Sequence, residues 1–277
     1  MKVRHLDCAT LCPIGGRWLT GYGSLLERAR LVCHCLLVEL DDGLLLVDTG
    51  LGLEDLGEPR RRLGRGFLAL TQPKLDEAQT AARQLEALGF SPHDVRHVVL
   101  THLDVDHAGG ISDFPEAVVH VLAAEHDATT HPRSTLERHR YRPAQWSHSP
   151  SWSLYQPEGE SWFGFGCVRN LDGVPPEVLL VPLPGHTRGH AAVAVRTDDG
   201  WLLHAGDAYF HHSEMDPDRR RCPPLLDLFE RLVQVDGEQQ FENQERLRVL
   251  ARENRGEVRV FSAHDAVEFE RLRGVDA

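Results

Sequence analysis

The chain has 277 residues, a formal charge of −12 and 41% hydrophobic residues, which is typical of a globular protein with a large core. The excess of acidic residues argues against a nucleic-acid-binding surface, which needs clustered Lys and Arg. No stretch approaches the ~20 apolar residues of a membrane span, and residues 1–16 lack the apolar segment of a secretory signal. We therefore expect a cytoplasmic protein without nucleic-acid or membrane partners.

Apolar runs bounded by turn residues predict a series of β-strands. These runs lie, in chain order, at residues 33–40, 43–50, 95–102, 117–124, 177–185, 191–197, 200–208 and 257–265. Helical spacing predicts helices at 75–90, 223–235 and 241–256. A weak internal repeat relates "DDGLLLVDTG" (41–50) to "DDGWLLHAGDA" (198–208). It favours two similar halves in one domain over residues 1–277, with two sheets packed face to face and helices outside.

Residues 130–172 follow neither pattern and are rich in Trp, Tyr, Phe, Pro and Ser. A long segment of this kind is commonly a functional lid, and such a lid can pack across a homodimer. Candidate pocket residues from this segment and beyond it are Tyr141, Trp146, Trp152, Tyr155 and His211. Arg140 and Arg142 are candidates to bind a substrate carboxylate. The alternative is that the aromatic residues form a small core beneath the segment.

Six cysteines occur in the chain, in which reduced thiols are expected. Cys33 and Cys35 lie in a predicted strand and are expected to be small core residues. The alternative is that they lie next to Cys8 and Cys12, where adjacent thiols would favour a redox role.

The segment "THLDVDHAGG" (101–110) places four potential metal ligands within six residues: His102, Asp104, Asp106 and His107. Alternate residues at a strand end share a face, so His102 and Asp104 point the same way. The chain then turns and presents the other two. The small residues that follow allow backbone to approach closely. Imidazole and carboxylate together suit zinc, iron or manganese, so the segment predicts a metal centre.

This segment resembles the H-x-H-x-D-H motif of the metallo-β-lactamase superfamily, with aspartate in place of the second histidine. Four further segments resemble that family's pattern in the same order: "LLLVDTG" (44–50), "PLPGHTRGH" (182–190), "LLHAGDA" (202–208) and "VFSAHD" (260–265). The resemblance implies an α+β fold, a four-layer αββα sandwich, and two divalent metal ions, with zinc expected first. The implied ligands are His102, Asp104, Asp106, His107, His186, Asp207 and His264, with Asp207 bridging the ions. It also implies that Asp48 and His190 support the ligands without binding metal.

Asp104 departs from the family motif, and three consequences are open. A carboxylate ligand would move the preference of the first site from zinc toward iron or manganese. Alternatively the side chain is too short to reach, and the first site is weak or empty. As a third alternative, it binds a metal-bound water and acts as a base. We favour direct or water-bridged ligation.

The resemblance is closest to the quorum-signal lactonases and related lactonases, and it implies hydrolysis of a small ester or lactone. A hydroxide held between the two metals would attack the carbonyl, with Asp106 binding metal and orienting this nucleophile. In that branch a tyrosine three residues after the bridging aspartate assists the reaction. Here Tyr209, two residues after Asp207, is the candidate. The alternative functions are an iron-dependent redox or oxygen-handling protein and a catalytically weak metal-binding sensor.

Overall fold

The computed structural model describes residues 1–167 and 170–274, and these ranges contain two main sheets. The first sheet has the order β1 (Lys2–Leu11), β2 (Leu31–Leu40), β3 (Gly43–Val47), β4 (Val95–Val99), β5 (Val118–Leu122), β6 (Ser151–Tyr155). The second has the order β12 (Val258–Phe261), β11 (Gly200–His204), β10 (Ala191–Thr197), β9 (Val178–Pro182). A small hairpin joins β7 (Ser161–Trp162) to β8 (Phe165–Gly166).

Strands β3 to β6 run parallel, and most residues of β3, β4 and β5 are buried because both faces of these strands are covered. Leu44 and Leu46 of β3 point to the helices outside the first sheet. Leu45 and Val47 point the other way, into a cluster that includes Val193 of the second sheet. The alternation of β3 therefore places one half of its side chains between the two sheets.

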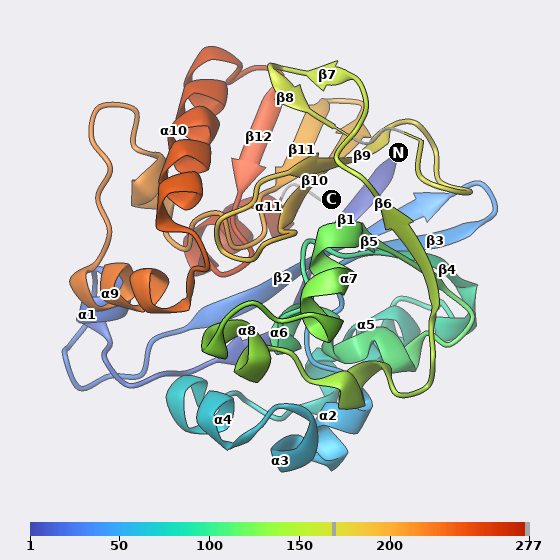
Figure 1. Ribbon diagram of the computed structural model, residues 1–277, viewed down its shortest axis with the longest axis horizontal. Coiled ribbons are helices and arrows are strands. Elements are labelled where there is room, and N and C mark those ends of the chain that lie inside the picture. The colour runs from blue at the N-terminus through green and yellow to red at the C-terminus, as the bar shows by residue number, and fades with distance from the viewer. Residues whose placement is uncertain (168–169, 275–277) are drawn as a thin grey trace.

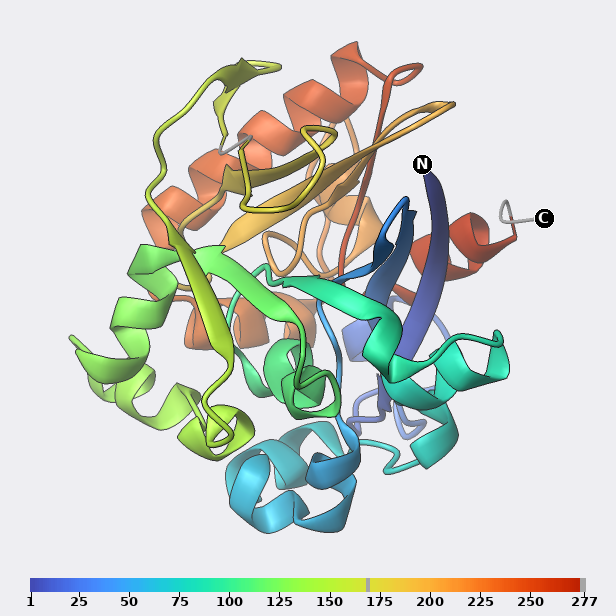
Figure 2. The same ribbon diagram turned by 90° about the vertical axis from the view of Figure 1, so that its right-hand side faces the viewer.

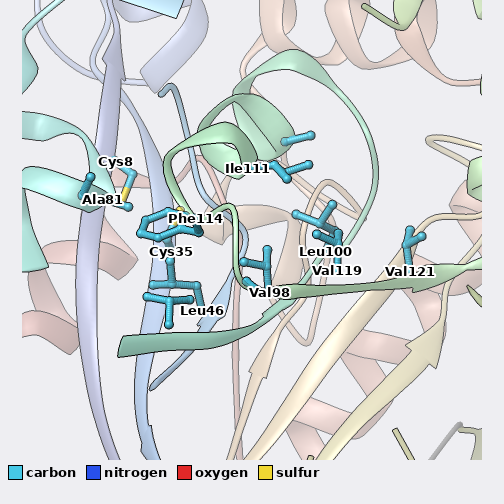
Figure 3. Packing of buried hydrophobic residues seen from close by; sticks show 14 of the residues in the cluster. Cys8, Cys35, Leu46, Ala81, Val98, Leu100, Ile111, Phe114, Val119 and Val121 are labelled. Carbon is cyan, nitrogen blue, oxygen red and sulfur yellow. The ribbon is translucent and has the colours of Figure 1, made fainter. Parts of the chain in front are cut away.

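Helices cover the outer faces of both sheets (Figures 1 and 2). α5 (Ala81–Ala87) and α7 (Ala123–Thr130) cover the first sheet, and Figure 3 shows Ala81 packed near Cys8 on that side. α10 (Gly237–Glu253) covers the second sheet through Leu247 and Leu250. The expected four-layer αββα sandwich is confirmed. None of the helices in the described ranges is long and apolar enough to cross a membrane.

The remaining helices are short or lie at the ends of the sheets. The α-helices are α1 (Arg17–Thr20), α2 (Leu53–Gly57), α3 (Pro59–Arg62), α4 (Arg65–Thr71), α6 (Val105–Ala108), α8 (Thr135–Arg140), α9 (Pro224–Val233) and α11 (Ala266–Arg273). Single 3₁₀ turns lie at Glu77–Gln79, Pro92–Asp94, Gly109–Asp113, Pro143–Trp146 and His212–Met215. α4, α8 and α9 surround one edge of the molecule in Figure 1, and this edge carries the candidate site described below.

The eight predicted strands are all present, but three sequence predictions need correction. The strand β1 was not predicted. The helix expected from residue 75 begins only at Ala81, because the Thr80 side chain accepts a hydrogen bond from the Arg83 N–H and so caps the helix there. Segment 130–172 is not simply a lid, since it contributes β6 to the edge of the first sheet. Residues 168–169 of that segment lie outside the described residues.

Candidate metal centre

The predicted ligands stand on loops that follow the carboxyl ends of four strands. His102 follows β4, His186 follows β9, Asp207 follows β11 and His264 follows β12. Asp106 and His107 belong to the short helix α6, which begins as soon as the chain leaves β4. The two sheets thus bring residues from distant parts of the sequence to one edge of the sandwich.

One group of ligand atoms comes from His102, Asp104, His186 and Asp207. Asp104 Oδ2 lies 3.5 Å from His102 Nε2 and 3.1 Å from His186 Nε2. Asp207 Oδ2 lies 3.7 Å from the first of these nitrogens and 3.3 Å from the second. Ligands at the usual distances from a tetrahedral zinc ion are about 3.4 Å apart. The Asp104 side chain is therefore long enough to reach this group.

A second group lies on the other side of Asp207. Its Oδ1 is 3.3 Å from His107 Nε2 and 3.1 Å from His264 Nε2. Asp106 Oδ2 lies 3.7 Å from His264 Nε2. Cys33, buried in β2 as expected for a core residue, also offers its sulfur beside Asp106 and His264. One oxygen of Asp207 faces each group, which is the arrangement that a bridging carboxylate requires.

The hydrogen bonds of two histidines show that these residues fit a divalent ion. Nδ1 of His107 donates to Asp48 Oδ2 (2.8 Å), and Nδ1 of His264 donates to the Val32 carbonyl (2.7 Å). Each Nε2 therefore presents a lone pair, yet the two nitrogens lie only 3.3 Å apart. His102 Nε2 and Asp104 Oδ1 are buried without a hydrogen-bond partner among the described residues. One cation in each group would give these atoms a partner.

Asp48 and His190 lie where supporting residues were expected. Asp48 has a left-handed backbone (φ 56°) and accepts hydrogen bonds from the Thr101 N–H, the Thr101 hydroxyl and His107. His190 donates from Nδ1 to the Leu183 carbonyl and accepts from the Asp207 N–H at Nε2 (2.9 Å). Gly206 fits this corner because a Cβ there would lie 2.5 Å from His190 Nε2.

The carboxylates of the centre have shifted pKa values. Burial alone would raise the pKa of Asp207, but its interactions with the His264 and His107 imidazoles hold it well below its ordinary value. Burial raises the pKa of Asp106, and the neighbouring charges of Asp207 and Asp104 act in the same direction. Three carboxylates so close together favour the binding of positive charge.

Glu125 is a supporting residue that the sequence did not indicate. Among the described residues, its buried carboxylate accepts hydrogen bonds from four donors: Leu103 N–H (3.0 Å), Tyr141 O–H (3.1 Å), Thr187 O–H (2.7 Å) and Gly189 N–H (3.1 Å). Leu103 and Thr187 directly follow the candidate ligands His102 and His186. Glu125 therefore ties together the two loops that carry these ligands.

The catalytic role expected for Tyr209 is corrected by its position. Its side chain is fully buried, and its hydroxyl donates to the carboxylate of Glu268 at 3.0–3.1 Å. The next residue, Phe210, lines the cavity beside the centre and stacks on the His264 ring with centroids 5.2 Å apart. An aromatic ring thus stands three residues after Asp207, as in the lactonase pattern, but it lacks the hydroxyl.

We expect Tyr209→Phe to lower the free energy of unfolding by about 1–2 kcal/mol, because one buried hydrogen bond to Glu268 is lost. Burial raises the pKa of Glu268 to about 8. The buried carboxyl group is therefore stabilised by the hydrogen bonds that it accepts, including the one from Tyr209. Activity should change by less than about twofold, since the hydroxyl does not face the cavity. Urea unfolding and kcat/KM on the same samples test both statements. A large loss of activity with unchanged stability would restore the catalytic role.

A cavity of about 540 Å³ opens onto the ligand atoms of Asp104, Asp106, His186, Asp207 and His264. Its walls are mainly apolar and come from residues 11–31, α4, α8 and α9. Wall residues include Leu19, Phe67, Leu70, Leu136, Leu228 and Leu232. Leu70, Leu228 and Leu232 are exposed at its mouth.

The five candidate pocket residues are not among those that line this cavity, so that expectation is corrected. Trp146 and Trp152 pack against the cluster outside the first sheet, which also contains Tyr141. The Tyr155 hydroxyl contacts His120 Nδ1, and His211 Nε2 donates to the Thr20 carbonyl. The aromatic residues of the lid segment thus support the framework, as the alternative interpretation stated. Arg140 and Arg142 do line the cavity.

Comparison with known proteins gives consistent results. The sequence model described as Metallo-beta-lactamase superfamily matches residues 28–264. A probable metallo-hydrolase of Mycobacterium tuberculosis is 45% identical over 265 residues, which cover 96% of this chain and 80% of that relative. An N-acyl homoserine lactonase of Rhizobium johnstonii is 38% identical, but the match covers only 58% of each chain.

A solved structure of an N-acyl homoserine lactone hydrolase, with the product N-hexanoyl-L-homoserine at its catalytic metal centre, superimposes with a TM-score of 0.69. The match covers 98% of this chain and 95% of that one at 22% identity. At this identity the likeness shows the fold alone.

Proposed function

The chain belongs to the metallo-β-lactamase superfamily and is a metallo-hydrolase, and we propose that it uses two divalent metal ions to hydrolyse a small ester or lactone that carries an apolar group. The observation that carries this proposal is the position of Asp207, which presents one oxygen to each of two ligand groups. The partial match to N-acyl homoserine lactonases supports the lactone class. Zinc is the proposed metal, because histidine supplies four of the ligands.

The residues of the proposed centre have different roles: some would hold metal ions, and others act on water or exclude it. His102, Asp104 and His186 would hold one ion and Asp106, His107 and His264 the other, with Asp207 shared. When bound, two such ions polarise a carbonyl and lower the pKa of water. Asp106 lies at the cavity wall with a raised pKa, where it can orient a water molecule and accept its proton. Phe210 covers one face of His264 and keeps water from that side.

The apolar walls indicate what the rest of the substrate is. A cavity of about 540 Å³ is large enough for a small lactone together with an acyl chain. Leu228 and Leu232 of α9 line the cavity together with Phe67 and Leu70 of α4. Burying an acyl chain between them stabilises the complex by up to about 0.8 kcal/mol for each methylene.

The first experiment is metal content per chain, together with kcat/KM on lactones and esters with acyl chains of increasing length. We expect two zinc ions and kcat/KM that rises with chain length, by up to about 200-fold for four methylenes. The variant Leu232→Arg should remove this dependence while short substrates react as before. Its control is Val249→Arg, which changes an exposed residue of α10 that does not line the cavity.

Other results of the same measurements would favour the two alternative functions. Tightly bound iron with visible absorption, and activity that zinc does not restore, would indicate a redox or oxygen-handling protein. One ion per chain and no turnover of any ester or lactone would indicate a metal-binding sensor.

A further inference from the structure

Arg140, the last residue of α8, places its guanidinium against the metal ligand Asp104. Its Nη1 donates to Asp104 Oδ2 at 3.0 Å and lies 3.1 Å from His186 Nε2. Its Nη2 donates to the Val233 carbonyl at the end of α9. The side chain of Arg140 is only 6% exposed, and that of Asp104 is 18% exposed. A buried guanidinium is thus held between a metal centre and two walls of the cavity.

A cation in this place requires a physical reason. Burying a charge is costly unless it is paired, and a cation beside a metal site opposes the binding of metal. A carboxylate at position 104 also gives the centre three acidic ligands, Asp104, Asp106 and Asp207, where a histidine would leave two. The positive charge of Arg140 cancels the charge that Asp104 adds. Together the pair has the same net charge as one neutral histidine.

The chemistry of the two side chains makes them depend on each other. A carboxylate has two oxygens and about four acceptor positions, so it can accept from a guanidinium and bind a metal at the same time. The Asp104 carboxylate is mostly buried and lies 3.0 Å from Arg140 Nη1, so its negative charge has a cationic partner. An imidazole that binds metal has no acceptor left for Arg140. With histidine at 104, the guanidinium would keep its hydrogen bond to the Val233 carbonyl but would be a buried cation without an anionic partner next to the ions.

We propose that Asp104 and Arg140 act as a matched pair, in which Asp104 is a ligand of the first metal site and Arg140 is the residue that positions it and neutralises its charge. This proposal rests on the proposed two-metal centre. The bond from Arg140 to the Val233 carbonyl also fixes α8 against α9, so the same guanidinium connects the centre to the cavity walls.

The test is a double-mutant cycle with zinc affinity as the readout. Wild type, Arg140→Met, Asp104→His and the double variant are freed of metal, and zinc binding is measured by competition with a chelating dye. We expect each single variant to bind zinc at the first site about 10–100-fold more weakly. The double variant should return to within about threefold of wild type, since both members of the pair are gone. Activity is not needed for this measurement.

Two further variants make the cycle specific. Arg142 also lines the cavity, but in the part of the chain that the structure describes it makes no hydrogen bond or ion pair with Asp104. Arg142→Met should therefore leave zinc affinity unchanged. Arg140→Lys keeps the charge without the planar fork and should bind zinc more weakly than wild type but more tightly than Arg140→Met. It also replaces Arg140→Met if that variant does not fold, as judged by circular dichroism of the metal-free protein.

Each outcome has one meaning. The pairing would be overturned if the fold-loss of zinc affinity in the double variant equalled the product of the fold-losses in the two single variants. It would also be overturned if Arg140→Met bound zinc with wild-type affinity at both sites. A single variant Asp104→His that binds zinc at the first site as tightly as wild type would also overturn the pairing. If wild type itself binds fewer than two ions, the proposed two-metal function fails, and this is seen before any variant is compared.

Discussion

Replacing Asp207 by alanine is expected to remove metal from both sites and to lower kcat/KM for esters and lactones by at least about 1,000-fold. The two oxygens of Asp207 face different ligand groups, at 3.3 Å from His186 Nε2 and 3.1 Å from His264 Nε2. No neighbouring carboxylate among the described residues reaches both groups. Elemental analysis after dialysis and steady-state kinetics measure the two losses. Asp198→Ala, at a fully exposed position, is the control and should change neither.

Chelation gives an independent check of the same residue. A chelator should lower the Tm of the wild-type protein, because the ions bind only the folded state and their removal leaves three buried carboxylates facing one another. It should leave the Tm of Asp207→Ala nearly unchanged, since that variant has little metal to lose. If one tightly bound ion remains in Asp207→Ala, then Asp207 serves a single site and is not a bridge.

Much of the candidate metal centre could be predicted from the sequence because its proposed ligands lie in short motifs at strand ends. The close spacing of His102, Asp104, Asp106 and His107 requires only that the chain turn after β4. The apolar runs that form β9, β11 and β12 likewise place His186, Asp207 and His264 at one edge. In each case local sequence sets the geometry, and the parallel strands then align the loops.

The supporting contacts could not be predicted because they join segments that are distant in sequence. The pairing of Arg140 with Asp104 depends on how α8 packs, and no pattern in residues 130–172 indicates that packing. Tyr209 and Phe210 are adjacent residues of a turn. Because a turn has no regular side-chain periodicity, the sequence does not indicate which of the two rings enters the cavity. Trp152 shows a related limit, since aromatic composition is the same for a cleft wall and for a residue packed on a sheet.

Replacing Glu125 by glutamine is the second change expected to have a large effect. The carboxylate accepts from Leu103, Tyr141, Thr187 and Gly189, whereas an amide has a single acceptor oxygen and adds two N–H donors that face these same donors. Hydrogen bonds to a charged group contribute about 1.5–3 kcal/mol each, and buried donors left unpaired are costly. We expect the free energy of unfolding to fall by about 3–5 kcal/mol, measured by urea unfolding of the metal-free protein.

The control for this loss is Thr187→Val, which removes one donor and leaves the carboxylate in place. It should cost about 1–2 kcal/mol in wild type but less in the Glu125→Gln background, where that donor already lacks its partner. Equal costs in the two backgrounds would show that the four hydrogen bonds do not act as a unit.

The position of Glu125 also predicts which of the two metal sites loses zinc affinity in Glu125→Gln. Its partners Leu103 and Thr187 follow His102 and His186, whose rings lie 5.0 Å apart and face the first site. His107 and His264 are held instead by Asp48 and by the Val32 carbonyl, which the substitution does not touch. Glu125→Gln should therefore weaken zinc binding at the first site and spare the second, whereas Asp207→Ala empties both. A Glu125→Gln protein that unfolds more easily yet keeps both zinc affinities would show that this carboxylate stabilises the fold without positioning the ligands.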